Sequence, residues 1–365
     1  ITYYFVNYVF QNKKAALIAA ALVAVNPFQI MYVTEARMYT MGAFFAVAAT
    51  FALAAALRTQ SLHYVTVANE VLRAQLKQRF IKYYLLFALS SAIMIYTHYY
   101  LLFTVAALGL YAIFYCIKNY KTQFTKYSWA LLSGILIAIS FLPWLKIFLF
   151  QFRQVGAGYW IPPIDRWSIP NTLWDLLLKF EHPAHWMIAI IAAFTIYIII
   201  RAIWKLKQTE KWLTIAGFLA PFAGAILFAI MAHIQHETSS VYLVRYFIFC
   251  STFYVILIAL WLNNFKIRQI GMLFTAILIL LNVYSVWNYW DNLQVQTKPG
   301  MAKASEFLTV NVEPQHKLFI GNYYEFFNFK YYNQTSVKPL VYTYGKQVDG
   351  LHHYEGTALL TNDDL

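Results

Sequence analysis

Long apolar runs separated by short polar turns occupy most of the first 290 residues of the chain. A run of about 20 apolar residues is long enough to cross the hydrocarbon core of a bilayer as a helix. Hydrophobic residues make up 61% of the chain and charged residues only 12%, whereas a soluble globular protein has roughly 25% charged residues. The sequence therefore predicts an all-α polytopic membrane protein.

Nine of these runs have the length of a whole transmembrane helix, and a shorter apolar stretch of ten residues precedes them. Because ten residues do not span a bilayer, we interpret residues 1–10 as the end of a partial first helix whose beginning is missing. The expected whole spans are residues 15–33, 40–57, 83–97, 101–117, 128–147, 186–204, 213–231, 246–262 and 270–288.

Basic residues are distributed unevenly between the two sets of loops. If the turn that contains Lys13 and Lys14 is cytoplasmic, the loops on its side hold 16 Lys and Arg residues and the short loops opposite hold 6. This asymmetry follows the positive-inside rule. The net charge of +13 is therefore explained by membrane topology, and nucleic-acid binding is excluded because the basic residues form no continuous face. We expect a multi-pass protein of the cell membrane with its active site on the extracytoplasmic face.

One outer loop, residues 148–185, is long and rich in Pro, Gly and Trp. Its tryptophans, which include Trp160, Trp167 and Trp174, have two interpretations. They are an ordinary aromatic belt at headgroup depth, or they belong to an ordered loop whose helix at residues 171–180 lies on the membrane and covers a lipid-facing cleft.

The character of the sequence changes after Trp290, where apolar and polar residues mix. A helical stretch at residues 301–310 is followed by strand-like runs at residues 317–320 and 340–344, with further apolar surface at 326–332. We predict a transmembrane domain at residues 1–290 and a small extracytoplasmic α/β domain at residues 291–365.

Three short clusters at the expected outer face each place a cation or an imidazole beside tyrosines: residues 35–39, 97–100 and 242–247. A guanidinium group is a planar donor that fits phosphate oxygens, and tyrosine rings stack on sugars and donate hydrogen bonds. The clusters therefore predict a site for a lipid phosphate at the membrane edge. The candidate binding residues are Arg37, Tyr39, His98, Tyr99, Arg245 and Tyr246.

Each cluster also has a purely structural interpretation. A pairing of Arg37 with Glu35, a snorkelling of Arg245 to the interface and a capping role of His98 would each explain one cluster without a ligand. Glu35 is a weak candidate for a catalytic base or metal ligand, and its better supported role is to orient Arg37. The sequence has no zinc-ligand pattern and leaves the involvement of a divalent metal open.

Four motifs and the C-terminal part of the chain resemble one family. The motifs are Asn26-Pro27-Phe28 leading to Glu35-Ala36-Arg37-Met38-Tyr39, Tyr96-Thr97-His98-Tyr99, Phe141-Leu142-Pro143-Trp144 closing a span, and Arg245-Tyr246 opening one; the tail carries Glu325-Phe326-Phe327 and Lys330-Tyr331-Tyr332. In these residues the chain is similar to the bacterial relatives of dolichyl-phosphate-mannose protein mannosyltransferases and to the lipid A aminoarabinose transferases, which are integral-membrane C-type glycosyltransferases.

The resemblance implies transfer of a sugar, with inversion, from a polyprenyl-phosphate donor to a lipid, glycan or protein acceptor. It implies that Arg37 and Arg245 hold the phosphate while His98, Tyr39 and Tyr246 line the donor pocket. In this family the catalytic acidic residue lies in the first outer loop, which would precede Ile1. We therefore expect residues 1–365 alone to bind donor weakly and not to transfer sugar.

Two alternatives from the sequence remain. A transporter or flippase would suit the number of spans, but such proteins place polar groups and broken helices near the bilayer midplane. Here the ionisable residues gather at the ends of the runs, with Pro221 as a helix breaker inside residues 213–231. A polyprenyl-diphosphate-dependent glycan polymerase or ligase shares the substrate chemistry. A scaffold or receptor would not need the repeated pairing of cation and tyrosine. Neither the sugar nor the acceptor is identified by the sequence.

Overall fold

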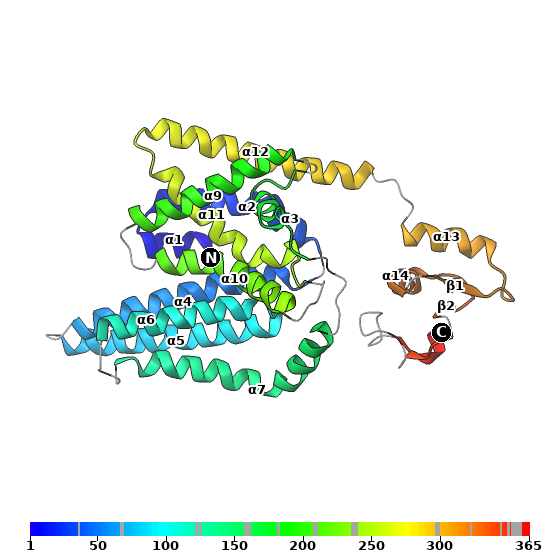
Figure 1. Cartoon of the computed structure of the whole chain (residues 1–365), viewed down its shortest axis with the longest axis horizontal. Coiled ribbons are helices and arrows are strands. Elements are labelled where there is room, and N and C mark those ends of the chain that lie inside the picture. The colour runs from blue at the N-terminus through cyan, green and yellow to red at the C-terminus, as the bar shows by residue number, and fades with distance from the viewer. Residues whose placement is uncertain are drawn as a thin grey trace. The chain divides into compact units, whose positions relative to one another are not determined.

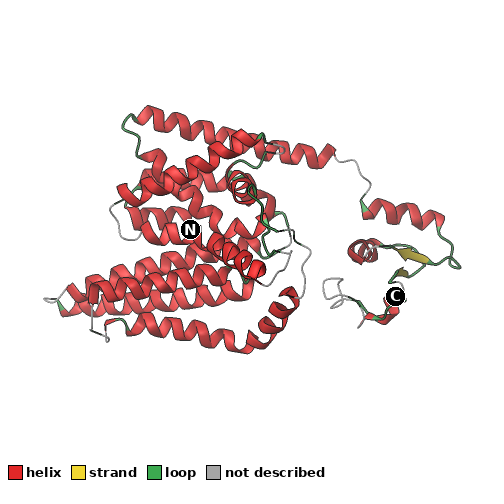
Figure 2. Cartoon of the chain, viewed as in Figure 1, coloured by secondary structure: helices red, strands yellow, loops and turns green. Residues whose placement is uncertain are grey.

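The computed structural model describes residues 1–35, 37–65, 69–120, 123, 126–156, 161, 163–180, 183–206, 211–234, 240–295, 300–321, 323–343, 345–348, 351 and 360–365. The chain forms two compact units, Ile1–Tyr289 and Trp290–Leu365. Helices make up nearly all of the first unit (Figures 1 and 2).

The helices of the first unit follow one another with short connections. They are α1 (Thr2–Phe10), α2 (Lys13–Ala24), α3 (Pro27–Val33), α4 (Tyr39–Val65), α5 (Glu70–Thr97), α6 (Leu101–Tyr120), α7 (Ser128–Gly156), α8 (Ser168–Leu177), α9 (His185–Lys205), α10 (Lys211–Ile234), the 3-10 helix η2 (Val244–Phe247), α11 (Ile248–Asn263) and α12 (Arg268–Val295). In the part of the chain that the structure describes, eight helical segments are long and apolar enough to cross a membrane. The predicted all-α, multi-pass membrane character is confirmed.

The expectation of one unbroken helix at residues 15–33 is wrong, because the structure breaks it into α2 and α3 with a bend of 50°. Together the two helices are still long and apolar enough for one broken span. Asn26 is the N-cap of α3, and its side chain accepts a hydrogen bond from the Gln29 amide at 3.0 Å. Pro27 follows in the first turn, where a residue without an N–H group is tolerated. The local sequence therefore starts a new helix inside an apolar run.

The boundaries predicted for the long outer loop are also wrong. Helix α7 does not end near residue 147 but continues to Gly156, with Pro143 inside it. A proline ring removes one backbone hydrogen bond and bends a helix, and α7 changes direction along its length (Figure 1). The carbonyl of Ser140, in the turn before Pro143, accepts a hydrogen bond from Tyr96 Oη at 2.6 Å.

The helix expected at residues 171–180 is present as α8, which is shifted toward the N-terminus and strongly amphipathic. Its Leu173, Leu176 and Leu177 are buried in the first unit, and Trp174 is only 2% exposed. Trp174 is therefore a core residue and not a belt residue, whereas Trp186 at the start of α9 is largely exposed. Of the other two tryptophans of the predicted loop, Trp167 is the N-cap of α8 and Trp160 lies outside the described residues.

Helix α11 forms the centre of the first unit, and almost all of its residues are buried. It is apolar on every side, as expected of a helix surrounded by others, and it packs against α2, α4, α9 and α10. Helices α4 and α5 lie side by side along their length (Figure 1). Alanines fill much of α4, and small residues allow helices in a bilayer to approach closely.

The second unit contains α13 (Met301–Asn311), β1 (Leu318–Ile320), α14 (Tyr323–Tyr332), β2 (Pro339–Val341) and a short 3-10 helix, η4 (Asn362–Asp364). The two strands pair in parallel, with Phe319 opposite Leu340. Phe326, Val341 and Leu360 form a small core. The strand predicted at residues 340–344 is shorter than expected, and Tyr344 lies outside the described residues.

Candidate functional site

A cavity of about 510 Å³ opens where the α5–α6 turn meets α7, α10 and the segment before α11. Most of its surface is aromatic or aliphatic, with a few polar atoms from His98, Tyr99 and Gln151. The residues that line it are Met38, Tyr96, Thr97, His98, Tyr99, Tyr100, Leu102, Phe103, Trp144, Phe148, Gln151, Phe152, Phe228, Val241 and Tyr246. An apolar hollow with a few convergent polar groups is the usual form of a binding site for an amphiphilic ligand.

His98 lies at the C-cap of α5 with extended backbone, and its amide donates to the carbonyl of Met94 at 3.1 Å. The amide of Tyr100 donates a hydrogen bond to His98 Nδ1 at 3.2 Å. Since an N–H donor faces Nδ1, the neutral ring carries its proton on Nε2. Burial lowers the pKa of His98 to about 4, so the ring presents a neutral Nε2–H donor at physiological pH.

The structure brings three candidate residues from different elements into one aromatic cluster. The ring of His98 lies 4.6 Å from that of Tyr246 in η2 and 6.0 Å from that of Tyr39 at the start of α4. The Tyr39 and Tyr246 rings are 6.5 Å apart. Tyr39 is almost fully buried behind the cavity wall, whereas His98 and Tyr246 line the cavity itself.

Arg37 is connected to this cluster through Tyr39. A hydrogen bond with Tyr39 raises the pKa of Arg37, and the negative charge of Glu35 acts in the same direction. Arg37 Nε lies 3.6 Å from Glu35 Oε2, and the Arg37 side chain is 51% exposed. The predicted pairing with Glu35 therefore exists, and it leaves about half of the Arg37 side chain accessible beside Met38, which lines the cavity.

Arg245 is not among the residues that line the described cavity, although Tyr246 next to it is. It lies within electrostatic range of the Tyr32 hydroxyl, as do Glu35 and Asp175. The Tyr32 ring packs edge-on against Tyr39, with ring centres 5.5 Å apart. Neither Arg37 nor Arg245 is among the residues that line the described cavity, and each adjoins it through a sequence neighbour that does, Met38 or Tyr246.

Tyr99, the sixth candidate, belongs to a row of polar side chains along the α7 wall of the cavity. Trp144 Nε1 donates to Tyr99 Oη at 2.8 Å, and Tyr99 Oη donates to Gln151 Oε1 at 2.5 Å. Gln151 was not predicted, because nothing in the sequence indicates that α7 continues so far and faces the α5–α6 turn. The motif that contains Trp144 was the only signal for this wall.

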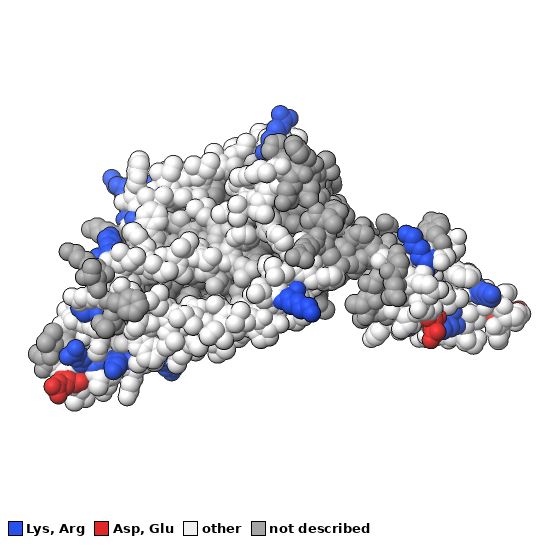
Figure 3. All heavy atoms as spheres, turned by 60° about the horizontal axis from the view of Figure 1, so that its bottom comes forward, with Lys and Arg blue, Asp and Glu red and all other residues white. Residues whose placement is uncertain are grey.

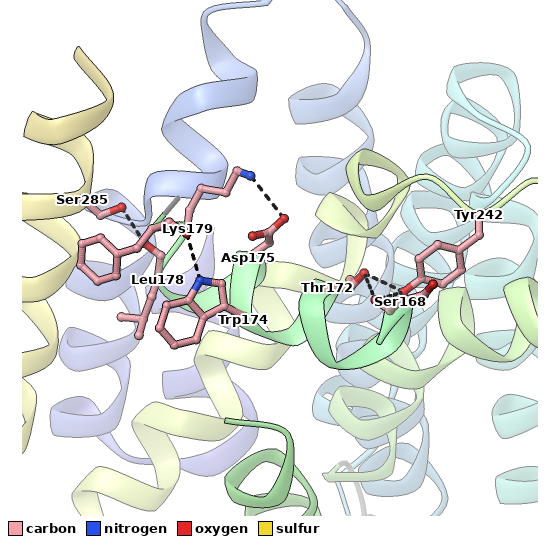
Figure 4. A network of polar contacts seen from close by, with 9 residues as sticks. Ser168, Thr172, Trp174, Asp175, Leu178, Lys179, Tyr242 and Ser285 are labelled. Carbon is pink, nitrogen blue, oxygen red and sulfur yellow. Dashed lines mark hydrogen bonds and ion pairs between the residues drawn. The ribbon is translucent and has the colours of Figure 1, made fainter. Parts of the chain in front are cut away.

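A buried polar network holds α8 and the segment before η2 together (Figure 4). Tyr242 Oη lies 2.6 Å from Thr172 Oγ1 and donates to the Ser168 carbonyl at 3.1 Å. Further along α8, Lys179 Nζ lies 3.2 Å from Asp175 Oδ2, and burial raises the pKa of Asp175. The network fixes the segment that carries Arg245 and Tyr246.

Asn26 ties the first motif to this network. Besides capping α3, its side-chain amide donates to the Leu176 carbonyl at 3.0 Å. Asp175 was not singled out by the sequence, in which it appears as one acidic residue of a long loop. Its position beside Tyr32 and Tyr242 arises only when α8 docks onto the unit.

No group of three or more His, Cys, Asp or Glu side chains among the described residues has the arrangement of a metal site. Cys116 and Cys250 are both buried and free. Comparison of the chain with protein-family models, with curated proteins and with solved structures found no match.

Proposed function

We propose that the protein transfers a sugar from a polyprenyl-phosphate donor to a lipid, glycan or protein acceptor at the outer face of the membrane, and that the first unit holds the donor. The observation that carries the proposal is the connection of a half-exposed guanidinium group, Arg37, to an aromatic cavity through Tyr39, His98 and Tyr246.

The polarity of the cavity supports a ligand that is apolar at one end and anionic at the other. Phe103, Phe148, Phe152 and Phe228 supply an apolar surface suited to isoprenyl units. At the other end, Arg37 supplies a charged donor to phosphate oxygens, and His98 Nε2 supplies a neutral one. A soluble sugar nucleotide would not use the phenylalanine-rich wall.

In the proposed reaction an acceptor hydroxyl attacks the anomeric carbon from the face opposite the phosphate. The bond between that carbon and the phosphate oxygen breaks, and polyprenyl phosphate leaves with the bonding electron pair. Positive charge beside the departing phosphate lowers the barrier, which is the role proposed for Arg37. The acceptor proton passes to a carboxylate of the enzyme other than Glu35, because Glu35 is paired with Arg37.

Trp144 provides an optical test, since it lines the cavity. The fluorescence of Trp144 is obtained by subtracting the emission of the Trp144→Phe variant from that of the unchanged protein. Both proteins are titrated in detergent micelles with undecaprenyl-phosphate hexose, undecaprenyl phosphate, undecaprenyl diphosphate and undecaprenol. We expect saturable changes with the monophosphates at lower concentration than with the diphosphate or the alcohol. Equal responses to phosphate and alcohol would contradict the proposal, and preference for the diphosphate would favour a polymerase or ligase.

A further inference from the structure

A second cavity, of about 500 Å³, lies at the other end of the α4–α5 pair. This cavity is much more polar than the first. The residues that line it come from the end of α4, the start of α5 and the start of α7: His63, Tyr64, Glu70, Arg73, Ala74, Lys77, Phe80 and Trp129.

Two cations face this cavity from one side of α5. Arg73 and Lys77 are four positions apart, so they lie on the same face of the helix. The Arg73 carbonyl also accepts a hydrogen bond from His63 Nδ1 at 2.9 Å, which leaves Nε2 as the other polar atom of that ring. Lys126 lies close by, with Nζ 4.9 Å from the centre of the Tyr64 ring. Among the described residues that line the cavity, Glu70 is the one acidic residue.

The lengths of α4 and α5 indicate the depth of this cavity in a membrane. Tyr39 and His63 are 24 positions apart on α4, which corresponds to about 36 Å of helix. The hydrocarbon core of a bilayer is about 30 Å thick. If the Tyr39 end lies at one headgroup layer, the second cavity lies at the other. Figure 3 shows Lys and Arg side chains gathered at the end of the unit where α4 ends and α5 begins in Figure 1.

Exposed apolar residues beside the cavity favour a lipid over a soluble anion. Val65 at the end of α4 is 76% exposed, and Val71 and Leu72 in the first turns of α5 are 70% and 42% exposed. Trp129 lines the cavity, and tryptophan prefers the membrane interface. A soluble phosphate compound would use the cations but would not cover these side chains.

We propose that the second cavity binds the headgroup phosphate of an anionic phospholipid from the leaflet opposite the proposed sugar-transfer site. Arg73 and Lys77 donate to the phosphate oxygens, and Trp129 packs against the glycerol and upper acyl region. Basic pockets between transmembrane helices have the chemistry for such headgroups. This site is independent of the sugar-transfer proposal, since the two share no residue.

Native mass spectrometry of the protein released from nanodiscs with equal amounts of phosphatidylglycerol and phosphatidylcholine tests this proposal. We expect retained phosphatidylglycerol on the protein, and about 30-fold weaker retention in the variant with both Arg73→Ala and Lys77→Ala, from a contribution of about 1 kcal/mol for each cation. The matched control is Arg79→Ala, an exposed arginine of the same helix that does not line the cavity.

The control is expected to retain phosphatidylglycerol as the unchanged protein does. Equal retention by the double variant would overturn the proposal, as would equal loss in Arg79→Ala, which would indicate a general effect of surface charge. Thermal unfolding of each variant verifies its fold, and the more conservative Arg73→Gln variant replaces the double variant if that one unfolds. Displacement of the lipid by sn-glycerol 3-phosphate at equal concentration would overturn the assignment to a lipid.

Discussion

The Tyr100 amide donates its hydrogen bond to His98 Nδ1 at 3.2 Å, which fixes the tautomer of a histidine on the wall of the larger cavity. A protonated ring would carry hydrogen on both nitrogens and would place N–H against N–H at this contact. Burial already lowers the pKa of His98 to about 4. His98 is therefore a neutral hydrogen-bond donor and not an acid or a base at neutral pH.

This state of His98 predicts how stability changes with pH. An unfolded histidine has a pKa near 6.5, so the unfolded chain binds the proton first as the pH falls. The contribution of His98 is complete above about pH 6.5 and declines as the pH approaches 4. Between pH 7 and pH 5 we expect a loss of about 1–2 kcal/mol that is absent in His98→Gln, measured by thermal unfolding in detergent. His185→Gln, at an exposed histidine of α9, is the control; an identical pH response in all three proteins would contradict the assignment.

Gly224 in α10 controls the position of a cavity ring. A Cβ atom at this position would lie 2.3 Å from Phe103 Cδ2, so the ring would have to move. We expect Gly224→Ala to destabilise the unit by about 1–3 kcal/mol and to weaken binding in the cavity that Phe103 lines. Gly109→Ala is the matched control, because a Cβ there meets no atom within 4 Å. If Gly224→Ala unfolds at the same temperature as Gly109→Ala, the packing around Phe103 is looser than described.

The Tyr242 hydroxyl holds α8 against the segment that leads to η2, through Thr172 and the Ser168 carbonyl. Removing it in Tyr242→Phe leaves buried oxygen atoms with fewer partners. We expect a loss of about 1–2 kcal/mol in unfolding free energy, and the measurement is again thermal unfolding in detergent. Tyr284→Phe, at a half-exposed tyrosine of α12, should be nearly neutral. Equal losses in the two variants would show that the hydroxyl is not part of the network.

The membrane spans could be predicted because apolar length alone determines which segments cross a bilayer. The break at Asn26 had a local signal, a capping residue followed by proline, but the apolar run around it concealed that signal. The end of α7 could not be predicted from Pro143, because neighbouring helices support a proline-containing helix in a membrane protein. The break at Asn26 is therefore local in origin, whereas the length of α7 depends on the helices around it.

Part of the candidate site could be predicted from the sequence, because cations beside tyrosines at the ends of spans stand out in an apolar chain. Which of these residues lie together in space could not be predicted. Tyr39, His98 and Tyr246 meet only after three helix ends converge. The contact of Asn26 with Leu176 joins residues 150 positions apart. Nothing near either residue in the sequence indicates the other, and the absence of both Arg37 and Arg245 from the cavity lining has the same cause.

The central claim is that Arg37 binds the phosphate of a polyprenyl lipid whose isoprenyl chain occupies the aromatic cavity. Removing a charged donor to phosphate costs about 1.5–3 kcal/mol, which corresponds to roughly 10- to 150-fold in affinity. The matched control is Arg166→Ala, at an exposed arginine before α8 whose sequence neighbours do not line the cavity, whereas Met38 beside Arg37 does.

The most direct measurement compares the affinities of the protein, Arg37→Ala and Arg166→Ala for undecaprenyl phosphate and for undecaprenol, in the same detergent. The account predicts that Arg37→Ala binds undecaprenyl phosphate at least about tenfold more weakly than the unchanged protein does, with no change in its affinity for undecaprenol. Arg166→Ala is predicted to bind both lipids as the unchanged protein does. Equal affinity of Arg37→Ala and the unchanged protein for undecaprenyl phosphate would contradict it.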